Sequence, residues 1–188
     1  MKWKRIGADV HADGVLGEWS CRTLSSGQGQ LLLETDAHPL LPLRVGLFGS
    51  PAEARLAAAC YEAIHATGRD SLAANATASG EDWTGQVRSG TGTLRLRVEH
   101  PGEGRATGSV QLTYVPGRGV RRSPVAVVEF GGRFDTGIAP EIHVAVAQAV
   151  AGARLAARGS HRHPLRDGEE LAAVDALDGL VAAPAARP

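Results

Sequence analysis

Arginines that alternate with apolar residues are the side chains of this chain best suited to do chemistry. In the segment 93–99 (TLRLRVE), leucine and valine alternate with Arg95 and Arg97. A β-strand points successive side chains to opposite faces, so both arginines are expected on the outward face. The segment 109–115 (SVQLTYV) alternates in the same way and, when paired with the first as a hairpin, adds Gln111 and Thr113 to that face. Guanidinium, amide and hydroxyl groups together can follow a phosphate backbone. The predicted binding residues, the last three from the adjoining loop, are Arg95, Arg97, Gln111, Thr113, Arg118, Arg121 and Arg122.

The same arginines have a second interpretation, which stays open. A solvated sheet face also carries charged residues, and these arginines would then pair with Glu99 and Glu129 and discourage edge-to-edge association. Proteins that bind single strands usually add aromatic rings on which bases stack. Only Trp83 and Tyr114 lie nearby, and the alternation places Tyr114 inward.

Residues that commonly carry catalysis or bind metals are scattered. Cys60 and His65 are five apart in a predicted helix, about 140° of rotation, so their side chains diverge and Cys60 falls on the apolar side. His161 and His163 are too few for a zinc site, and a solvated loop is expected there. No nucleophile elbow, phosphate-binding loop or dinucleotide fingerprint occurs. The sequence predicts no catalytic residue, no cofactor and no metal site. A dispersed catalytic site would need His38, His65, His100 or His143 beside a carboxylate or thiol.

Composition limits the classes of partner. The 188 residues carry a formal net charge of zero, so no whole-molecule field attracts nucleic acid or an anionic membrane. Residues 81–160 carry ten basic and seven acidic side chains and form the net-positive part of the chain. Arginine supplies 18 of the 20 basic residues, which is typical of a high-G+C bacterium. Two cysteines, no export signal and no run of 18 apolar residues predict a cytoplasmic protein without membrane contact.

The first half reads as strands followed by one helix. Strands are expected over 2–10, 18–25, 27–36 and 41–49, the last with Leu41, Leu43, Val45 and Leu47 on one side. The helix begins at SPAE, where Ser50 is the expected N-cap, Pro51 the first helical residue and Glu53 the partner that closes a capping box. A small, polar linker over 68–81 is expected to follow.

The second half repeats this layout with longer loops. It begins near Trp83, continues with strands over 93–99, 109–115 and 125–130, and ends in a helix from about Pro140 to Arg158. A break at 159–163 precedes a last helix from Asp167, for which Glu170 has capping-box spacing. The predicted units are therefore 1–67, the linker 68–81, 82–160, and a C-terminal helix with a frayed tail over 161–188.

The fold class that follows is α+β, with antiparallel sheets each followed by an amphipathic helix. The stretches 17–34 and 81–99 each contain an acid–Trp pair, a polar patch and a leucine-rich run, which suggests tandem ββββα units. Two small sheets would also look alike without duplication, and this alternative stays open.

The order of elements resembles that of the Whirly and PUR-type binders of single-stranded nucleic acid. The stretch 82–100 is similar to small actinobacterial domains of unknown role, some of which neighbour toxin systems. The function expected is a non-enzymatic binding module whose partner is nucleic acid or an acidic protein surface. The alternative is a protein-interaction or immunity-type subunit that acts through apolar edges and the C-terminal helix, with homo-oligomerisation as one form of it.

Overall fold

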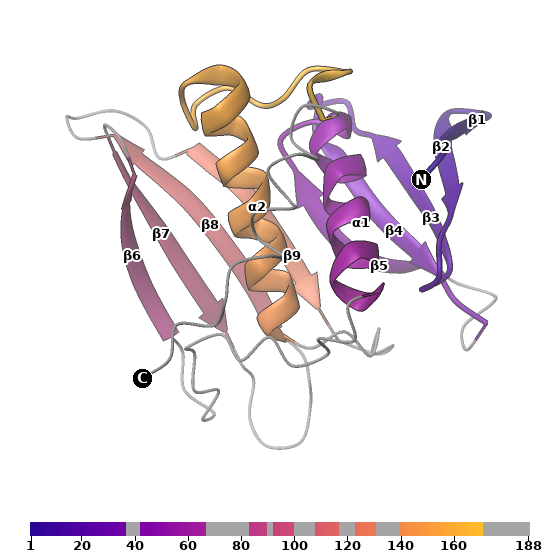
Figure 1. The fold of residues 1–188 in the computed structure, drawn as a ribbon, viewed down its shortest axis with the longest axis horizontal. Helices are drawn as coiled ribbons and strands as arrows, with labels where there is room; N and C mark the ends of the chain where they lie inside the picture. Colours follow the sequence, from indigo (N-terminus) through magenta and orange to yellow (C-terminus); the bar gives the residue numbers. More distant parts are fainter. Residues whose placement is uncertain are drawn as a thin grey trace.

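The computed structural model describes residues 1–36, 42–66, 83–89, 92–99, 108–116, 123–130 and 140–170; between 83 and 130 it describes backbone course and pairing. The chain is an α+β fold, an antiparallel sheet with helices packed against it (Figure 1). The elements are β1 (Lys4–Ile6), β2 (Asp9–Asp13), β3 (Glu18–Thr23), β4 (Gly29–Glu34), β5 (Leu43–Phe48), α1 (Pro51–Ala66), β6 (Trp83–Ser89), β7 (Gly92–Glu99), β8 (Gly108–Pro116), β9 (Ser123–Phe130) and α2 (Pro140–Arg158).

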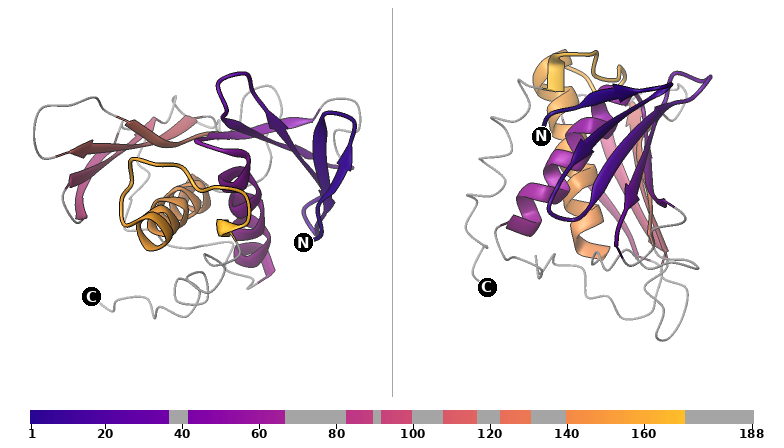
Figure 2. Two further views of the ribbon diagram at one scale, coloured as in Figure 1. Left: turned by 90° about the horizontal axis from the view of Figure 1, so that it is seen from above. Right: turned by 90° about the vertical axis from the view of Figure 1, so that its right-hand side faces the viewer.

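The described strands form one sheet in the order β1-β2-β3-β4-β5-β9-β8-β7-β6. The last strand of each half therefore pairs with the other, through Gly46 with Val128, Leu47 with Val127 and Phe48 with Ala126. Figure 2 shows α1 and α2 side by side on one face of this sheet. We call the opposite face the helix-free face, since no described helix covers it. Among the described helices, none is both long and apolar enough to cross a membrane.

A bulge near the end of each half changes which residues face the helices. Leu31 pairs with Gly46 but Leu32 pairs with Arg44, so Val45 is an extra residue on β5. In the second half Leu112 pairs with Ala126 but Thr113 pairs with Pro124, which leaves an extra residue, Val125, on β9.

The bulge corrects the predicted alternation of β5. Leu43 and Val45 are buried as expected, but Leu47 is only partly buried, and Phe48 is fully buried in its place. An extra residue shifts the phase of a strand by one, so the side chains beyond it exchange faces. Leu41 lies outside the described residues.

The N-terminal segment is a hairpin, where a single strand over 2–10 was predicted. Gly7 has φ of +63°, a left-handed conformation that β-carbons disfavour, and it reverses the chain between β1 and β2. The prediction was wrong because a glycine inside an alternating run leaves the period unchanged while permitting a turn.

The N-terminus of α1 follows the sequence closely. The Ser50 hydroxyl accepts a hydrogen bond from the Glu53 backbone N–H at 3.3 Å, which confirms Ser50 as the N-cap. The Glu53 carboxylate reaches one residue further back than predicted, to the Gly49 N–H at 2.9 Å. Leu56 and Cys60 are buried as expected, and Cys60 is a core residue.

The core lies between the sheet and the two helices. Trp19 of β3 stacks on Tyr61 of α1 with ring centroids 5.6 Å apart, and both side chains are buried. Ile142, Val146 and Val150 of α2 are buried and stand four residues apart, as the apolar face of an amphipathic helix requires. Burial of these three on one helix face secures α2 against the sheet and α1, because it removes their apolar surface from water.

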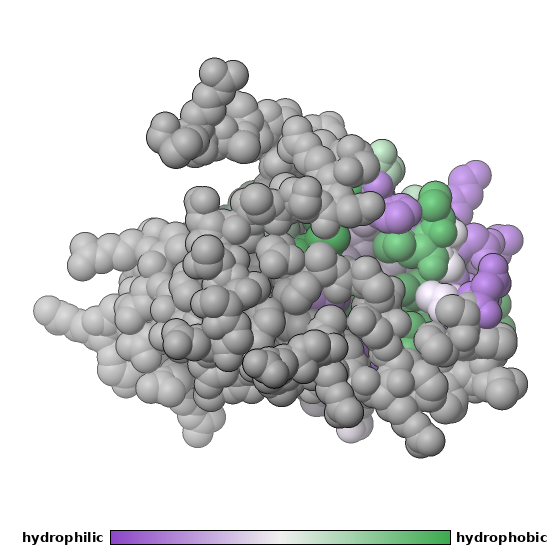
Figure 3. Space-filling model, turned by 90° about the horizontal axis from the view of Figure 1, so that it is seen from below, coloured by the Kyte–Doolittle hydropathy of each residue, from purple (hydrophilic) through white to green (hydrophobic). Residues whose placement is uncertain are grey.

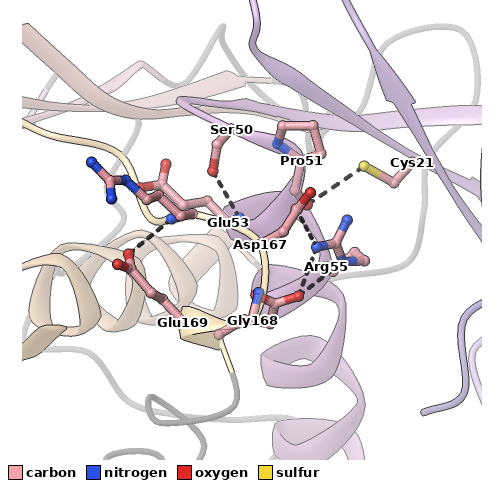
Figure 4. A network of polar contacts seen from close by, with 10 residues as sticks. Cys21, Ser50, Pro51, Glu53, Arg55, Asp167, Gly168 and Glu169 are labelled. Atoms are coloured by element: carbon pink, nitrogen blue, oxygen red, sulfur yellow. Dashed lines mark hydrogen bonds and ion pairs between the residues drawn. The ribbon is translucent and has the colours of Figure 1, made fainter.

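The segment after α2 folds back onto the helices. Arg55 of α1 donates hydrogen bonds to Asp167 at 2.7 Å and to Glu170 at 2.7 Å (Figure 4). The predicted capping box is wrong in its register, because the Glu170 carboxylate accepts the Gly168 N–H at 2.7 Å, and the Glu169 carboxylate accepts the Arg166 N–H at 2.8 Å. The predicted helix beyond residue 170 lies outside the described residues.

Candidate functional site

Four of the seven predicted binding residues occupy adjacent positions in the sheet. Arg95 pairs with Thr113, and Arg97 pairs with Gln111, in the antiparallel register of β7 and β8. Residues directly opposite in an antiparallel pair share a face, so these positions lie together as the hairpin interpretation required. Arg118, Arg121 and Arg122 lie outside the described residues.

The register also decides which face this is. Phe48 belongs to the buried core, its partner on β9 is Ala126, and Ala126 pairs with Leu112. Leu112 in turn pairs with Leu96 of β7. These positions share the helix-covered face, and the alternate positions 95, 97, 111 and 113 belong to the helix-free face.

Uncharged residues surround both arginine positions across the strands. Arg97 lies between Gln111 of β8 and Thr84 of β6, and Arg95 lies between Thr113 and Gln86. Glu99 pairs with Ser109, and Ser109 pairs with Glu129, so the two carboxylates share a row two residues along the strand from Arg97. In the alternative interpretation Arg97 would pair with Glu99, two residues along the same strand, or with Glu129, two strands away, because neither glutamate lies directly across from an arginine.

The aromatic positions of this half belong to the other face. Trp83 pairs with Val98, and Tyr114 pairs with Leu94. Val98 and Leu94 each stand two residues from Leu96, so these positions share its helix-covered face. The register therefore places no ring of β6 or β8 among the four candidate positions. Contacts to phosphate, and not base stacking, are the chemistry this arrangement offers a nucleic acid.

The helix-free face continues across the first half with a different charge balance. On β2 to β5 this face carries four carboxylates and two arginines. They are Asp9, Asp13, Glu18, Glu34, Arg22 and Arg44. In the second half the same face takes Arg88, Arg95 and Arg97 against Glu99 and Glu129. A polyanion is therefore better accommodated by β6 to β9 than by β2 to β5.

Sequence reasoning missed Arg22 and Gln30, which are direct cross-strand partners on the helix-free face. The signal was present, since both stand out of phase with the buried residues of the segments EWSCRT and GQLLLE. Arg22 donates from Nε and Nη2 to the Asp9 carboxylate at 3.1 and 3.0 Å, and 54% of its side chain is exposed.

The ionisable groups of the core are held in unreactive states. Burial raises the pKa of the Cys21 thiol to about 11 and that of Cys60 to about 12, so neither forms the nucleophilic thiolate at neutral pH. The Cys21 thiol donates a weak hydrogen bond to the Pro51 carbonyl oxygen at 3.7 Å (Figure 4). These two cysteines are structural in character.

His143 meets a hydroxyl in the core. Its Nδ1 shares a 2.8 Å hydrogen bond with the Tyr61 hydroxyl, and both residues are buried. Burial lowers the pKa of His143 to about 3 and raises that of Tyr61 well above its usual value. Both groups are neutral at physiological pH, which suits a structural contact between α1 and α2 more than proton transfer.

An ion pair lies fully buried between the two helices. Arg154 of α2 binds both carboxylate oxygens of Glu53, through Nε and, at 2.7 Å, through Nη2. The same carboxylate accepts the Leu165 N–H at 3.0 Å, and Arg154 donates to the His161 carbonyl oxygen at 2.9 Å. Together these contacts join α1, α2 and the folded-back segment.

His161 corrects a prediction. It is 2% exposed, whereas His163 is exposed, so the expected solvated pair of imidazoles does not form. Its backbone carbonyl oxygen accepts a hydrogen bond from Arg154, and its side chain interacts with the backbone of Ala151, so the turn after α2 is held against that helix. Within the described part of the chain, no group of three or more histidine, cysteine, aspartate or glutamate residues is placed to hold a metal ion.

The described surface beyond the sheet is mixed in polarity. Figure 3 shows green apolar patches beside purple hydrophilic ones in the part of the molecule that is coloured. Among the residues whose burial the structure describes, the exposed large apolar side chains are Met1, Ile6, Val15 and Leu155. Ile6 ends the outermost strand β1, whose three residues are all exposed.

No family model matches the chain, and searches of curated proteins and of solved structures found no match.

Proposed function

We propose that this protein is a non-enzymatic, cytoplasmic binding module that holds a single-stranded nucleic acid against the helix-free face of β6 to β9. The observation that carries the proposal is the register of β6, β7 and β8. It surrounds Arg95 and Arg97 with the uncharged positions Thr84, Gln86, Gln111 and Thr113 on the face opposite the helices. Two arginine positions without a carboxylate position directly across from them suit the binding of phosphates.

The predicted mode of binding is electrostatic and indifferent to base sequence. The aromatic positions Trp83 and Tyr114 have the phase of the helix-covered face, so phosphate contacts supply the affinity. Arg118, Arg121 and Arg122 of the loop after β8 extend the proposed surface along the sequence. The binding free energy should then fall steeply as salt rises.

We also propose that the two halves are tandem ββββα units. Two features support this: the palindromic part of the strand order, β2-β3-β4-β5-β9-β8-β7-β6, and a bulge in each half that adds one valine to the strand before the helix. The acid–Trp motifs do not support it, because Trp19 lies on the third strand before its helix and Trp83 on the fourth.

The experiment is a salt titration of binding to fluorescent oligothymidylate, followed by anisotropy. The wild-type protein should show a linear fall of log affinity with log salt concentration. Arg95→Ala with Arg97→Ala should reduce the slope by about 1.4, because each phosphate that an arginine neutralises on a single strand contributes about 0.7. Arg162→Ala is the matched control, since this arginine is exposed in the segment after α2, away from the sheet. Binding that ignores salt, or an equal effect in both variants, would exclude the proposal.

A second function, capture of a protein partner, is favoured by one observation. The edge strand β1 is exposed along all its residues, and a strand edge offers unpaired backbone groups to an added strand. Replacing Arg5 by Pro would remove the N–H of the central residue of β1. If the protein forms a homo-oligomer through this edge, light scattering should report a smaller mass for the variant. An unchanged mass would count against this route.

A further inference from the structure

The strand register relates the two halves by an approximate two-fold axis through the centre of the sheet. Matching the bulged valines, Val45 with Val125, makes Gly46 equivalent to Ala126 and Phe48 to Val128. The pair Gly46–Val128 then exchanges with the pair Phe48–Ala126, and Leu47–Val127 maps onto itself. The positions of the bulges and the pairing of β5 with β9 are separate observations, and both place the axis between Leu47 and Val127.

The same matching can be carried outward strand by strand. The pairs Leu31–Gly46 and Leu112–Ala126 are the last before each bulge, so Leu31 corresponds to Leu112. Their partners on the next strand outward, Cys21 and Leu96, therefore correspond as well. One residue away on each strand, Arg22 becomes equivalent to Arg97 and Gln30 to Gln111. The side-chain types are identical at both positions.

Each half thus carries an arginine and a glutamine as direct cross-strand partners, Arg22 with Gln30 and Arg97 with Gln111. All four positions belong to the helix-free face and to one row that crosses the strands. Leu47 and Val127 complete the row at its centre. The arginine positions are separated by five steps between neighbouring strands, about 24 Å at about 4.8 Å per step.

The row differs between the halves at its outer ends. In the second half Thr84 pairs with Arg97. In the first half Val10 pairs with Cys21, so the residue before it, Asp9, is the equivalent of Thr84. The Asp9 carboxylate holds the guanidinium of Arg22 with two hydrogen bonds. Arg22 is therefore neutralised by Asp9, whereas the position paired with Arg97 is a threonine.

We infer that the Arg22–Gln30 and Arg97–Gln111 pairs are two symmetry-related contact points of a single site, along which a single-stranded nucleic acid crosses the strands of the helix-free face, and that Asp9 shields the first point. The inference rests on the proposed function, because it names the extent and direction of the same surface. Complementarity between the phosphates and a pair of arginines is its chemical basis. The acidic residues of the first half then limit binding chiefly through Asp9, the carboxylate in direct contact with an arginine of the row.

The test replaces Asp9 by Thr, which gives the first point the residue type that the second already has. Salt titrations with oligothymidylate should show a slope steeper by about 0.7, the value for one additional phosphate bound on a single strand. Adding Arg22→Ala to this variant should return the slope to the wild-type value. Asp13→Thr is the matched control, since it removes a carboxylate from the same strand and face that pairs across from Glu18 and not from Arg22.

The outcomes separate this inference from the proposed function. If Arg95→Ala with Arg97→Ala flattens the salt dependence while Asp9→Thr behaves like Asp13→Thr, the two-point site is overturned and the function stands. If the Arg95 and Arg97 variants leave the salt dependence unchanged, both are overturned. Far-ultraviolet circular dichroism of each variant should match the wild type, because Asp9 and Arg22 are a surface pair; a variant that fails this check is replaced by Asp9→Asn.

Discussion

The buried pair of Glu53 and Arg154 is expected to be the most sensitive electrostatic contact among the described residues. Both side chains are almost completely inaccessible to water, at 0% and 1% exposure. One Glu53 oxygen accepts from Arg154 Nε and the Leu165 N–H, and the other accepts from Arg154 Nη2 and the Gly49 N–H. The perturbation to make is Glu53→Gln, which preserves the shape of the side chain and removes its charge.

The size of the effect follows from these contacts. Whichever way the new amide turns, its NH₂ group replaces an oxygen that accepted two hydrogen bonds, so two donors are left without their acceptor. Arg154 also keeps a buried charge without its counter-ion. Breaking a buried ion pair from one side costs about 3–5 kcal/mol of unfolding free energy, a large part of the roughly 5–15 kcal/mol typical of a domain.

Urea unfolding followed by circular dichroism measures this destabilisation, and Glu62→Gln is the matched control on the same helix. Glu62 accepts hydrogen bonds from the Trp19 indole N–H at 2.7 Å and from the backbone N–H groups of Val15 and Leu16 at 2.8 and 3.1 Å. Its replacement weakens bonds to a carboxylate nearer the surface and should cost about 1–2 kcal/mol. Adding Arg154→Met to Glu53→Gln should recover part of the stability, because the uncompensated charge is gone.

The reasoning fails if Glu53→Gln is no more destabilising than Glu62→Gln. It also fails if the double variant is less stable than Glu53→Gln alone by the full cost of a second, independent substitution. Either result would mean that the charge of Arg154 is compensated by something other than Glu53.

Two further predictions concern the core and the folded-back segment. The depressed pKa of His143, about 3 against 6.5, means that the unfolded chain binds a proton that the folded chain excludes, so stability should decrease as pH falls below 6.5, by about 2 kcal/mol at pH 5. Urea midpoints between pH 4 and 8 should show this decrease, His143→Gln should flatten the dependence, and the lowered pKa of His161 should leave a residual slope of the same sign. Arg55→Ala should release the segment that carries Asp167 and Glu170, so trypsin should cleave after Arg162 and Arg166 faster than in the wild type, as measured by mass spectrometry. Equal cleavage rates would show that the Glu53 and Arg154 contacts alone retain the segment.

The spacing of apolar residues predicted most strands and both helices, because that spacing depends on residues close together in the sequence. The alternation in 93–99 and 109–115 predicted β7, β8 and their pairing, and SPAE predicted the start of α1 at its observed residue. The two failures in the strands share one cause, since Gly7 and Val45 alter the direction or the phase of the chain without changing the local pattern. A turn or bulge of one residue is decided by the strand that pairs with it.

One part of the candidate surface could be predicted from the sequence, and the other part required the tertiary structure. That Arg95, Arg97, Gln111 and Thr113 share a face follows from alternation alone, because side chains of a strand alternate whatever surrounds them. The position of Arg22 and Gln30 in the same row cannot be read from alternation, because within the sheet the two halves are joined by the pairing of β5 with β9.

What the sequence determined by itself was most of the elements, the N-cap of α1 and the alternation of β7 and β8, all of which depend on residues a few positions apart. Only the tertiary structure decided that Glu53 would meet Arg154 across 101 residues, that His161 would be buried, and that the two halves would share one sheet. The physical reason is that burial of a charge or an imidazole depends on partners brought together from distant parts of the chain. No spacing within a segment specifies which distant partner will arrive.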